Sequence, residues 1–193
     1  MSRTTIIVVA VLLLLGVYGC SSYNGLVQKD TQVENAWANV QTQYQRRADL
    51  IPNLVRTVQG AANFEKSTLT AVIQARANAT GINLSADQLT PENIQKFQAA
   101  QDQLGGSLSR LLAVAENYPQ LRATQNFSEL QAQLEGTENR ITVARNDFNG
   151  VATSYNQSVR AFPNNIFAGI FGFERKGLFQ ASQAAQNAPT VQF

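Results

Sequence analysis

The stretch VENAWANVQTQYQRRADLIPNLVRTV, residues 33–58, decides the fold. Its apolar residues recur in steps of three and four, a spacing typical of a helix that packs lengthwise against other helices. The members of this stripe are Val33, Trp37, Val40, Tyr44, Ala48, Ile51, Val55 and Val58. Because the periodicity resumes in phase after Pro52, we expect a kink there and not an end. With Leu69 and Val72 continuing the stripe, the pattern predicts one helix from about residue 24 to 78, on the order of 80 Å long.

Two further helical runs follow toward the C-terminus. Thr90-Pro91-Glu92 has the N-cap, first-turn proline and early carboxylate of a helix start, and Pro119 marks the end of that run. A third run opens at Asn126 and stops at Phe162-Pro163-Asn164. Their stripes comprise Ile94, Phe97, Gln101, Leu104, Leu108, Leu111, Ala115 and Tyr118, then Phe127, Leu130, Leu134, Thr137, Ile141, Ala144, Phe148, Val151, Tyr155, Val159 and Phe162. We therefore predict an all-α fold, an elongated antiparallel bundle of three to four long, coiled-coil-like helices with an N-terminal membrane anchor.

The N-terminus has the layout of an export signal, with Arg3 preceding an apolar run from Ile6 to Tyr18. This run is shorter than the ~20 residues that comfortably span a bilayer, so a short transmembrane helix is one possible anchor. The other is lipid, because Val17-Tyr18-Gly19-Cys20 resembles a lipobox in which Cys20 would be lipidated and become the mature N-terminus. In both cases Arg3 holds the N-terminus in the cytoplasm and the body is exported. Ser21 after a lipidated cysteine resembles lipoproteins sent to an outer membrane.

The expected organisation has four parts. Residues 1–22 form the anchor, 23–163 the helical bundle, 164–179 an aromatic-rich C-terminal segment and 180–193 a flexible tail. The formal net charge of +2 provides no strong field for nucleic acid. With no histidine and one cysteine, the sequence lacks His-based acid/base catalysis and nearly all zinc sites. We therefore predict a protein that is not an enzyme and that uses no cofactor or metal.

Several sequence blocks between residue 23 and about residue 179 together form a specific signature. They are Tyr23-Asn24-Gly25-Leu26-Val27, Ala36-Trp37, Gln43 to Val55, Gln59-Gly60-Ala61-Ala62, Glu116 to Leu121, Thr137 to Ile141, Ala144-Arg145, Tyr155-Asn156, Phe162-Pro163 and Gly172-Phe173. In combination they resemble the LemA family. The resemblance implies a single N-terminal membrane anchor, an antiparallel helical bundle and no established enzymatic activity. It also implies a link to membrane organisation, because related proteins in magnetosome-forming bacteria are associated with forming internal membranes.

Charged residues beside the apolar stripes form the first candidate site. We predict a structural polar network that fixes helix register, as polar core groups can in coiled coils, at a cost in desolvation. Its candidate members are Arg46, Arg47, Asp49, Glu116, Glu138, Arg140 and Arg145.

The second candidate site is the glycine-interrupted, aromatic-rich stretch from Ile166 to Phe179, which falls outside the bundle periodicity. Three roles are open for it: capping the bundle, packing against a neighbouring subunit, or inserting in a membrane interface. The expected oligomer or membrane contacts are Ile166, Phe167, Ile170, Phe171, Phe173 and Phe179.

Two functional hypotheses follow. The first is a membrane-anchored scaffold of the bacterial cell envelope that forms homo-oligomers through Gln-rich faces and organises or remodels membrane. The second is an adaptor that presents its bundle to an envelope membrane protein or sensor complex. An enzyme is the weakest alternative, because Ser67, Ser107 and Ser154 have no histidine partner and no nucleophile-elbow context.

Overall fold

The computed structural model of the protein describes residues 2–60 and 64–180. All regular structure within these ranges is helical, and the predicted all-α class is confirmed. In chain order the elements are α1 (Arg3–Gln59), α2 (Lys66–Gly81), the 3₁₀ turn η1 (Ala86–Gln88), α3 (Pro91–Ala115), α4 (Pro119–Arg122), α5 (Gln125–Arg160) and α6 (Asn164–Phe171).

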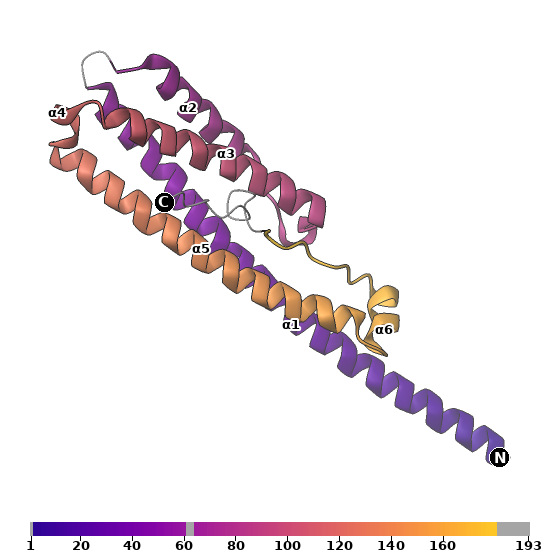
Figure 1. Ribbon diagram of the computed structural model, residues 1–193. Helices are drawn as coiled ribbons and strands as arrows, with labels where there is room; N and C mark the ends of the chain where they lie inside the picture. Colours follow the sequence, from indigo (N-terminus) through magenta and orange to yellow (C-terminus); the bar gives the residue numbers. More distant parts are fainter. Residues whose placement is uncertain (1, 61–63, 181–193) are drawn as a thin grey trace, which may run out of the picture.

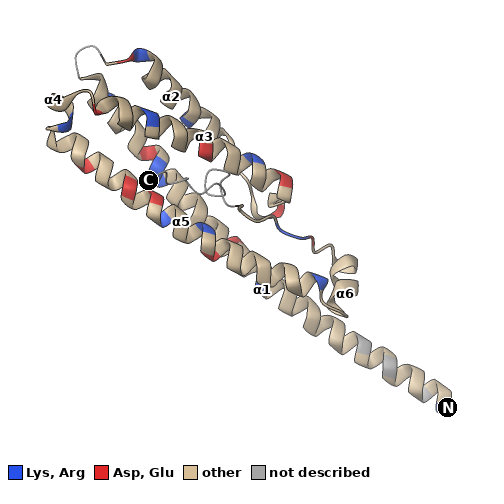
Figure 2. Ribbon diagram, in the orientation of Figure 1, with Lys and Arg blue, Asp and Glu red and all other residues tan. Residues whose placement is uncertain are grey.

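The long helices α1 and α5 pack side by side and run in opposite directions, while α2 and α3 form a second antiparallel pair (Figure 1). The short helix α6 packs against α1 and α5 where α5 ends. The N-terminal part of α1 extends beyond this point, away from the body (Figure 1). No Asp, Glu, Lys or Arg lies between Arg3 and Lys29, whereas charges of both signs are scattered over the body (Figure 2). The molecule is therefore a rod that carries scattered charges of both signs, continued by an apolar helix.

The apolar stripes form the core. Every residue of the stripe in 33–58 is buried, as periodic burial of one helix face requires. The core divides into two apolar clusters, one nearer α6 that includes Trp37, Phe97 and Phe148, and one near α4 that includes Leu54, Leu111 and Phe127. Phe162 departs from the expected pattern, because it lies beyond the end of α5 and is 82% exposed.

The prediction of one helix from about residue 24 to 78 is wrong at both ends, because α1 already begins at Arg3 and stops well before residue 78. The helix passes through Pro52 and ends at Gln59, and α2 begins as a separate helix at Lys66. Proline lacks the N–H that would bond to the carbonyl four residues earlier, here that of Ala48. In the structure the Arg76 Nε of α2 donates to this Ala48 oxygen at 2.8 Å. The packing of α2 thus compensates for the defect that Pro52 introduces.

Candidate functional site

A buried arginine connects the helices between the two apolar clusters. Arg47 of α1 is 3% exposed, and its Nη2 donates to the backbone oxygen and to Oε1 of Gln101 on α3, at 3.1 and 2.7 Å. Its Nη1 donates to Glu138 Oε2 on α5 at 2.9 Å. Gln101 Nε2 in turn donates to the Ala79 carbonyl of α2 at 3.4 Å. Four helices therefore meet in one polar layer, which we call the Arg47 layer.

The surroundings of Arg47 favour a fixed cation. Its guanidinium lies over the Tyr44 ring, 5.1 Å from the centroid, a geometry in which the ring quadrupole attracts the charge. Burial raises the pKa of the Tyr44 hydroxyl above its ordinary value and keeps it neutral, although Arg145 and Arg47 act in the opposite direction. The Glu138 side chain is 58% exposed, so that ion pair is partly screened by solvent. The hydrogen bonds to Gln101 are the buried part of the layer.

Of the seven residues predicted to form a network, the structure brings Arg47 and Glu138 into contact. Arg46, Asp49, Glu116 and Arg140 are exposed. Asp49 accepts a hydrogen bond from Gln45, its neighbour on the same helix, at 2.8 Å. The seventh, Arg145, donates to the Gln180 carbonyl at 3.0 Å.

Gln101 belongs to the layer but not to the network predicted from the sequence. The sequence nevertheless marks it, because it is a polar amide in the apolar stripe that forms the core face of α3. A polar residue at such a seam position often fixes register.

Residues 173–180 form an extended segment, here called the strap, that runs back along the bundle (Figure 1). Three side-chain amides hold its backbone by paired hydrogen bonds. Asn156 binds the N–H and C=O of Lys176, both at 2.8 Å, and Asn149 binds those of Phe179, both at 2.9 Å. Gln98 does the same for Gln180, at 3.0 and 2.9 Å. These amides thereby satisfy backbone N–H and C=O groups of the strap, which is not paired with a neighbouring strand among the described residues.

Two strap side chains complete the docking. Lys176 Nζ lies 3.0 Å from Asp30 Oδ1 of α1 and donates to the Ala86 carbonyl at 3.0 Å. Phe179 is 6% exposed and packs on Trp37, Phe97 and Phe148 in the aromatic core. The expectation that Phe179 contacts a neighbouring subunit or membrane is therefore wrong, because its ring completes the bundle's own core. Residues 181–193, expected to form a flexible tail, lie outside the described residues.

Four of the other predicted contact residues, Ile166, Phe167, Ile170 and Phe171, lie on a structure that we call the collar, which consists of Phe162 and α6. Asn164 Oδ1 accepts hydrogen bonds from the hydroxyls of Tyr18 and Ser22 on α1, at 3.0 and 3.1 Å. The rings of Phe167 and Tyr18 are 5.7 Å apart, and those of Phe171 and Tyr23 are 4.9 Å apart. The collar is thus bonded to α1 where its apolar run ends.

On the collar, Phe167 is half-buried, while Ile166, Ile170 and Phe171 are exposed. Phe173, at the start of the strap, is half-buried and packs on Tyr23 with ring centroids 5.7 Å apart.

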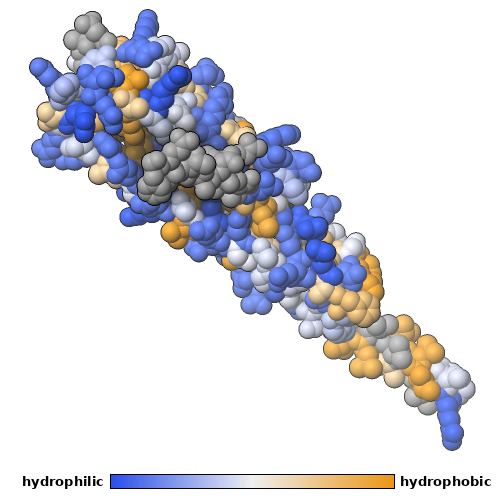
Figure 3. All heavy atoms as spheres, in the orientation of Figure 1, coloured by the Kyte–Doolittle hydropathy of each residue, from blue (hydrophilic) through white to orange (hydrophobic). Residues whose placement is uncertain are grey.

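The anchor has its own features at this end. The N-terminal part of α1 is long and apolar enough to cross a membrane, and its described side chains from Ser2 to Tyr18 are exposed. Cys20 is a free, exposed thiol on the same helix. In the space-filling view, apolar surface covers this helix and continues onto the adjoining end of the body (Figure 3).

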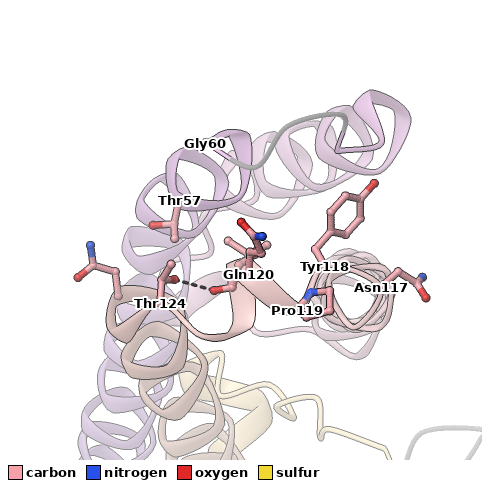
Figure 4. Close-up of a pocket in the computed structure, with 9 residues that line it drawn as sticks. Thr57, Gly60, Asn117, Tyr118, Pro119, Gln120 and Thr124 are labelled. Atoms are coloured by element: carbon pink, nitrogen blue, oxygen red, sulfur yellow. Dashed lines mark hydrogen bonds between the residues drawn. The ribbon is translucent and has the colours of Figure 1, made fainter.

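The opposite end of the rod carries an open hollow of about 730 Å³. In Figure 4 the Tyr118 ring stands across this hollow from Thr57 and Thr124. Its lining consists of Thr57, Gly60, Asn117, Tyr118, Pro119, Gln120, Leu121, Thr124 and Asn126. The lining offers amides and hydroxyls, which suit hydrogen bonding to a neutral polar group more than proton transfer at neutral pH. Among the residues that the structure describes, no three His, Cys, Asp or Glu side chains are grouped to hold a metal ion.

The comparisons with known proteins agree with the resemblance seen in the sequence. Magnetosome proteins MamQ 1 and MamQ 2 of Paramagnetospirillum magneticum are each 28% identical to this chain over 179 residues, covering 84% of the chain. The chain spans 66% of the length of either relative. Protein LemA of Metamycoplasma hominis is 26% identical over 160 residues, covering 83% of this chain and 69% of its own length. None of these names denotes an enzyme activity. Since the LemA family model matches residues 36–193, the chain belongs to the LemA family.

Proposed function

We propose that this protein is a non-enzymatic, membrane-anchored helical scaffold that self-associates and organises membrane. The observation that carries the proposal is the continuity of α1, which runs unbroken from the apolar N-terminal run through the whole body (Figure 1). A helix of 57 residues is about 85 Å long at 1.5 Å per residue. A body joined to its anchor without a linker keeps its orientation to the membrane, and this is what a scaffold needs.

The surface of α5 supports association between copies. Its exposed residues include the uncharged amides Gln125, Gln133, Asn139, Asn146 and Gln157, which lie among the exposed charged residues Glu129, Glu135, Glu138, Arg140, Asp147 and Arg160. Burying an amide against another amide exchanges hydrogen bonds with water for hydrogen bonds with protein, whereas burying a charge costs several kcal/mol or more. Only 15% of the residues of the chain are charged, so uncharged amides occupy many of its exposed helix positions. The proposed partner is a second copy of the same chain.

The membrane part of the proposal draws on the likeness to the magnetosome proteins and on the apolar end of α1. We place the body on the exported side of the bacterial envelope, since Arg3 precedes the apolar run. An outer-membrane position follows if Cys20 is lipidated.

Self-association is tested by chemical crosslinking of the full chain in detergent and in vesicles over a range of protein concentrations. We expect a ladder of crosslinked oligomers. Vesicles that carry the protein should also have a narrower distribution of diameters than vesicles without it. The double variant Asn139→Lys/Asn146→Lys places two charges on one face of α5 and should weaken the ladder. The matched control, Ala71→Lys/Asn78→Lys, places the same charges with the same spacing on the exposed face of α2. A strictly monomeric protein at every concentration would contradict the proposal.

The hollow at the far end favours one second candidate, an adaptor for an envelope membrane protein or sensor complex. A cavity of about 730 Å³ is within the range that accepts a small ligand or a short partner segment. Here the test is crosslinking in whole cells with a photoreactive side chain at Thr57, compared with the same group at the exposed Ala71 on α2. A stoichiometric foreign protein crosslinked from position 57 alone supports the adaptor, and adducts of the chain with itself count against it.

A further inference from the structure

The collar presents a concentrated apolar surface to solvent. Phe162, Ile166, Ile170 and Phe171 are 82, 52, 69 and 47% exposed. The segment 161–173 contains no charged residue. By contrast, Ile73 on α2 and Val143 on α5 are isolated exposed apolar residues of the kind that any soluble surface carries. A cluster within ten residues indicates a contact surface.

The position of the collar identifies what it contacts. Its inner side is bonded to residues 18–23 of α1, through the hydroxyls of Tyr18 and Ser22 on Asn164 and through the Tyr23 ring on Phe171. Phe167 lies against Gly19, where an added Cβ would come within 2.9 Å of its ring. The apolar surface of the collar is therefore continuous with the end of the anchor.

The length of the anchor places these residues at the membrane. The apolar run Ile6 to Tyr18 covers about 20 Å at 1.5 Å per residue, less than the ~30 Å of a hydrocarbon core. A full span starting near Thr4 would reach Tyr23, so the segment that binds the collar would lie at the outer membrane interface. If the chain is instead lipidated at Cys20, the acyl chains are attached to α1 within the same segment. The hydrogen bond from Ser22 and the ring contact of Tyr23 with the collar are then retained.

We propose that the exposed face of the collar inserts into the interface of the membrane that holds the anchor, as a second contact that fixes the tilt of the rod. Both modes of anchoring lead to the same place. Tyr23, which both modes retain, and Tyr18, which the spanning mode retains, suit it, because aromatic residues with a polar tip favour the level of the lipid headgroups. The inference rests on the membrane anchorage in the proposed function and adds the surface by which the body itself meets lipid.

The test uses tryptophan fluorescence of the full chain in phospholipid vesicles. The native Trp37 is 2% exposed inside the core and gives a constant background in every variant. Ile170→Trp places a second tryptophan on the collar, and Ile73→Trp, at a similarly exposed position on α2, is the matched control. With phospholipids brominated on the acyl chains, we expect the added emission of Ile170→Trp to be quenched about threefold or more relative to that of Ile73→Trp, with a blue shift.

Each other outcome overturns the inference in a recognisable way. Equal quenching of the two added tryptophans, in protein that floats with the vesicles, rejects the lipid contact and leaves the anchor intact. A blue shift at position 170 without quenching by brominated lipid shows that protein, for example a second copy, covers the collar. Wild-type protein that fails to float with vesicles rejects both the collar contact and the membrane anchorage in the proposed function.

Discussion

At the residue scale, Arg47 is the buried charge at which four helices meet. It is the one charged residue that is buried among the described residues, and it is held by hydrogen bonds to Gln101 and by the ion pair with Glu138. A buried cation requires such partners because its desolvation is costly. The layer divides the core into two apolar clusters, so it specifies which turn of α1 faces which turn of α3 and α5.

Replacing Arg47 with Met should destabilise the protein by about 1–3 kcal/mol, because the buried carbonyl and side-chain amide of Gln101 lose their donor. Glu138→Gln should cost less than about 1 kcal/mol, since the carboxylate is largely exposed. Urea denaturation of the full chain in detergent, followed by circular dichroism at the helical band, measures both. The control Arg46→Met removes the exposed arginine that directly precedes Arg47 and should change the free energy of unfolding by less than about 0.5 kcal/mol. Equal losses for Arg46→Met and Arg47→Met would disprove the buried layer.

At the element scale, α1 and α2 are coupled through the backbone defect at Pro52. Arg76→Met should cost about 1–2 kcal/mol in the wild-type chain, because the Ala48 carbonyl loses its hydrogen-bond donor. In a Pro52→Ala background the restored N–H of residue 52 can bond to that carbonyl, so Arg76→Met should cost less. A double-mutant cycle from urea denaturation should therefore give a coupling of about 0.5 kcal/mol or more. Additive effects of the two substitutions would show that the Arg76 bond is unrelated to the proline.

The strap depends on a glycine that allows close approach of two backbones. A Cβ on Gly177 would lie 2.8 Å from both Pro91 Cα and the Thr90 carbonyl, and the Gly177 N–H donates to the Leu89 carbonyl at 2.7 Å. Gly177→Ala should therefore displace the strap and cost about 1–3 kcal/mol.

Hydrogen exchange measures this displacement at the strap amides of residues 176, 179 and 180, which should exchange faster in Gly177→Ala. The control is Gly150→Ala on α5, where an added Cβ meets no atom within 4 Å. That change should leave the strap protected and stabilise the helix by up to about 1 kcal/mol. Unchanged exchange in Gly177→Ala would mean that the strap tolerates the extra methyl group and is not held at this approach.

At the scale of the whole molecule, the anchor determines how the rod is attached. We expect intact-mass spectrometry of the mature protein to give a chain that starts at Cys20 and carries a diacyl or triacyl modification, since residues 17–20 resemble a lipobox. Cys20→Ser should abolish the modification and leave the N-terminal segment in place. A wild-type chain that retains Met1 or Ser2 and has no lipid would identify a short transmembrane helix instead.

Much of the helical architecture was predictable because its signals are local. Each of three signals is encoded by residues close together in the sequence, namely the apolar stripe of residues 33–58, the N-cap at Thr90 and the break at Pro119. The structure has all three as predicted. The end of α1 was mispredicted because the stripe at Leu69 and Val72 is equally compatible with a continuing helix and with a second helix that folds back.

What the sequence by itself determined is therefore the helical class, the core faces, the apolar N-terminus and the family. The tertiary structure decided the sites, because their members are distant in the chain and no local pattern connects them. Arg47 meets Gln101 across 54 residues, and Tyr18 meets Asn164 across 146. Phe179 shows the limit most clearly, since its apolar character indicates burial but only the path of the strap shows that it is buried in its own bundle and not against a partner or a membrane. Periodicity fixes which side of a helix is apolar, whereas the packing of all helices together fixes what that side contacts.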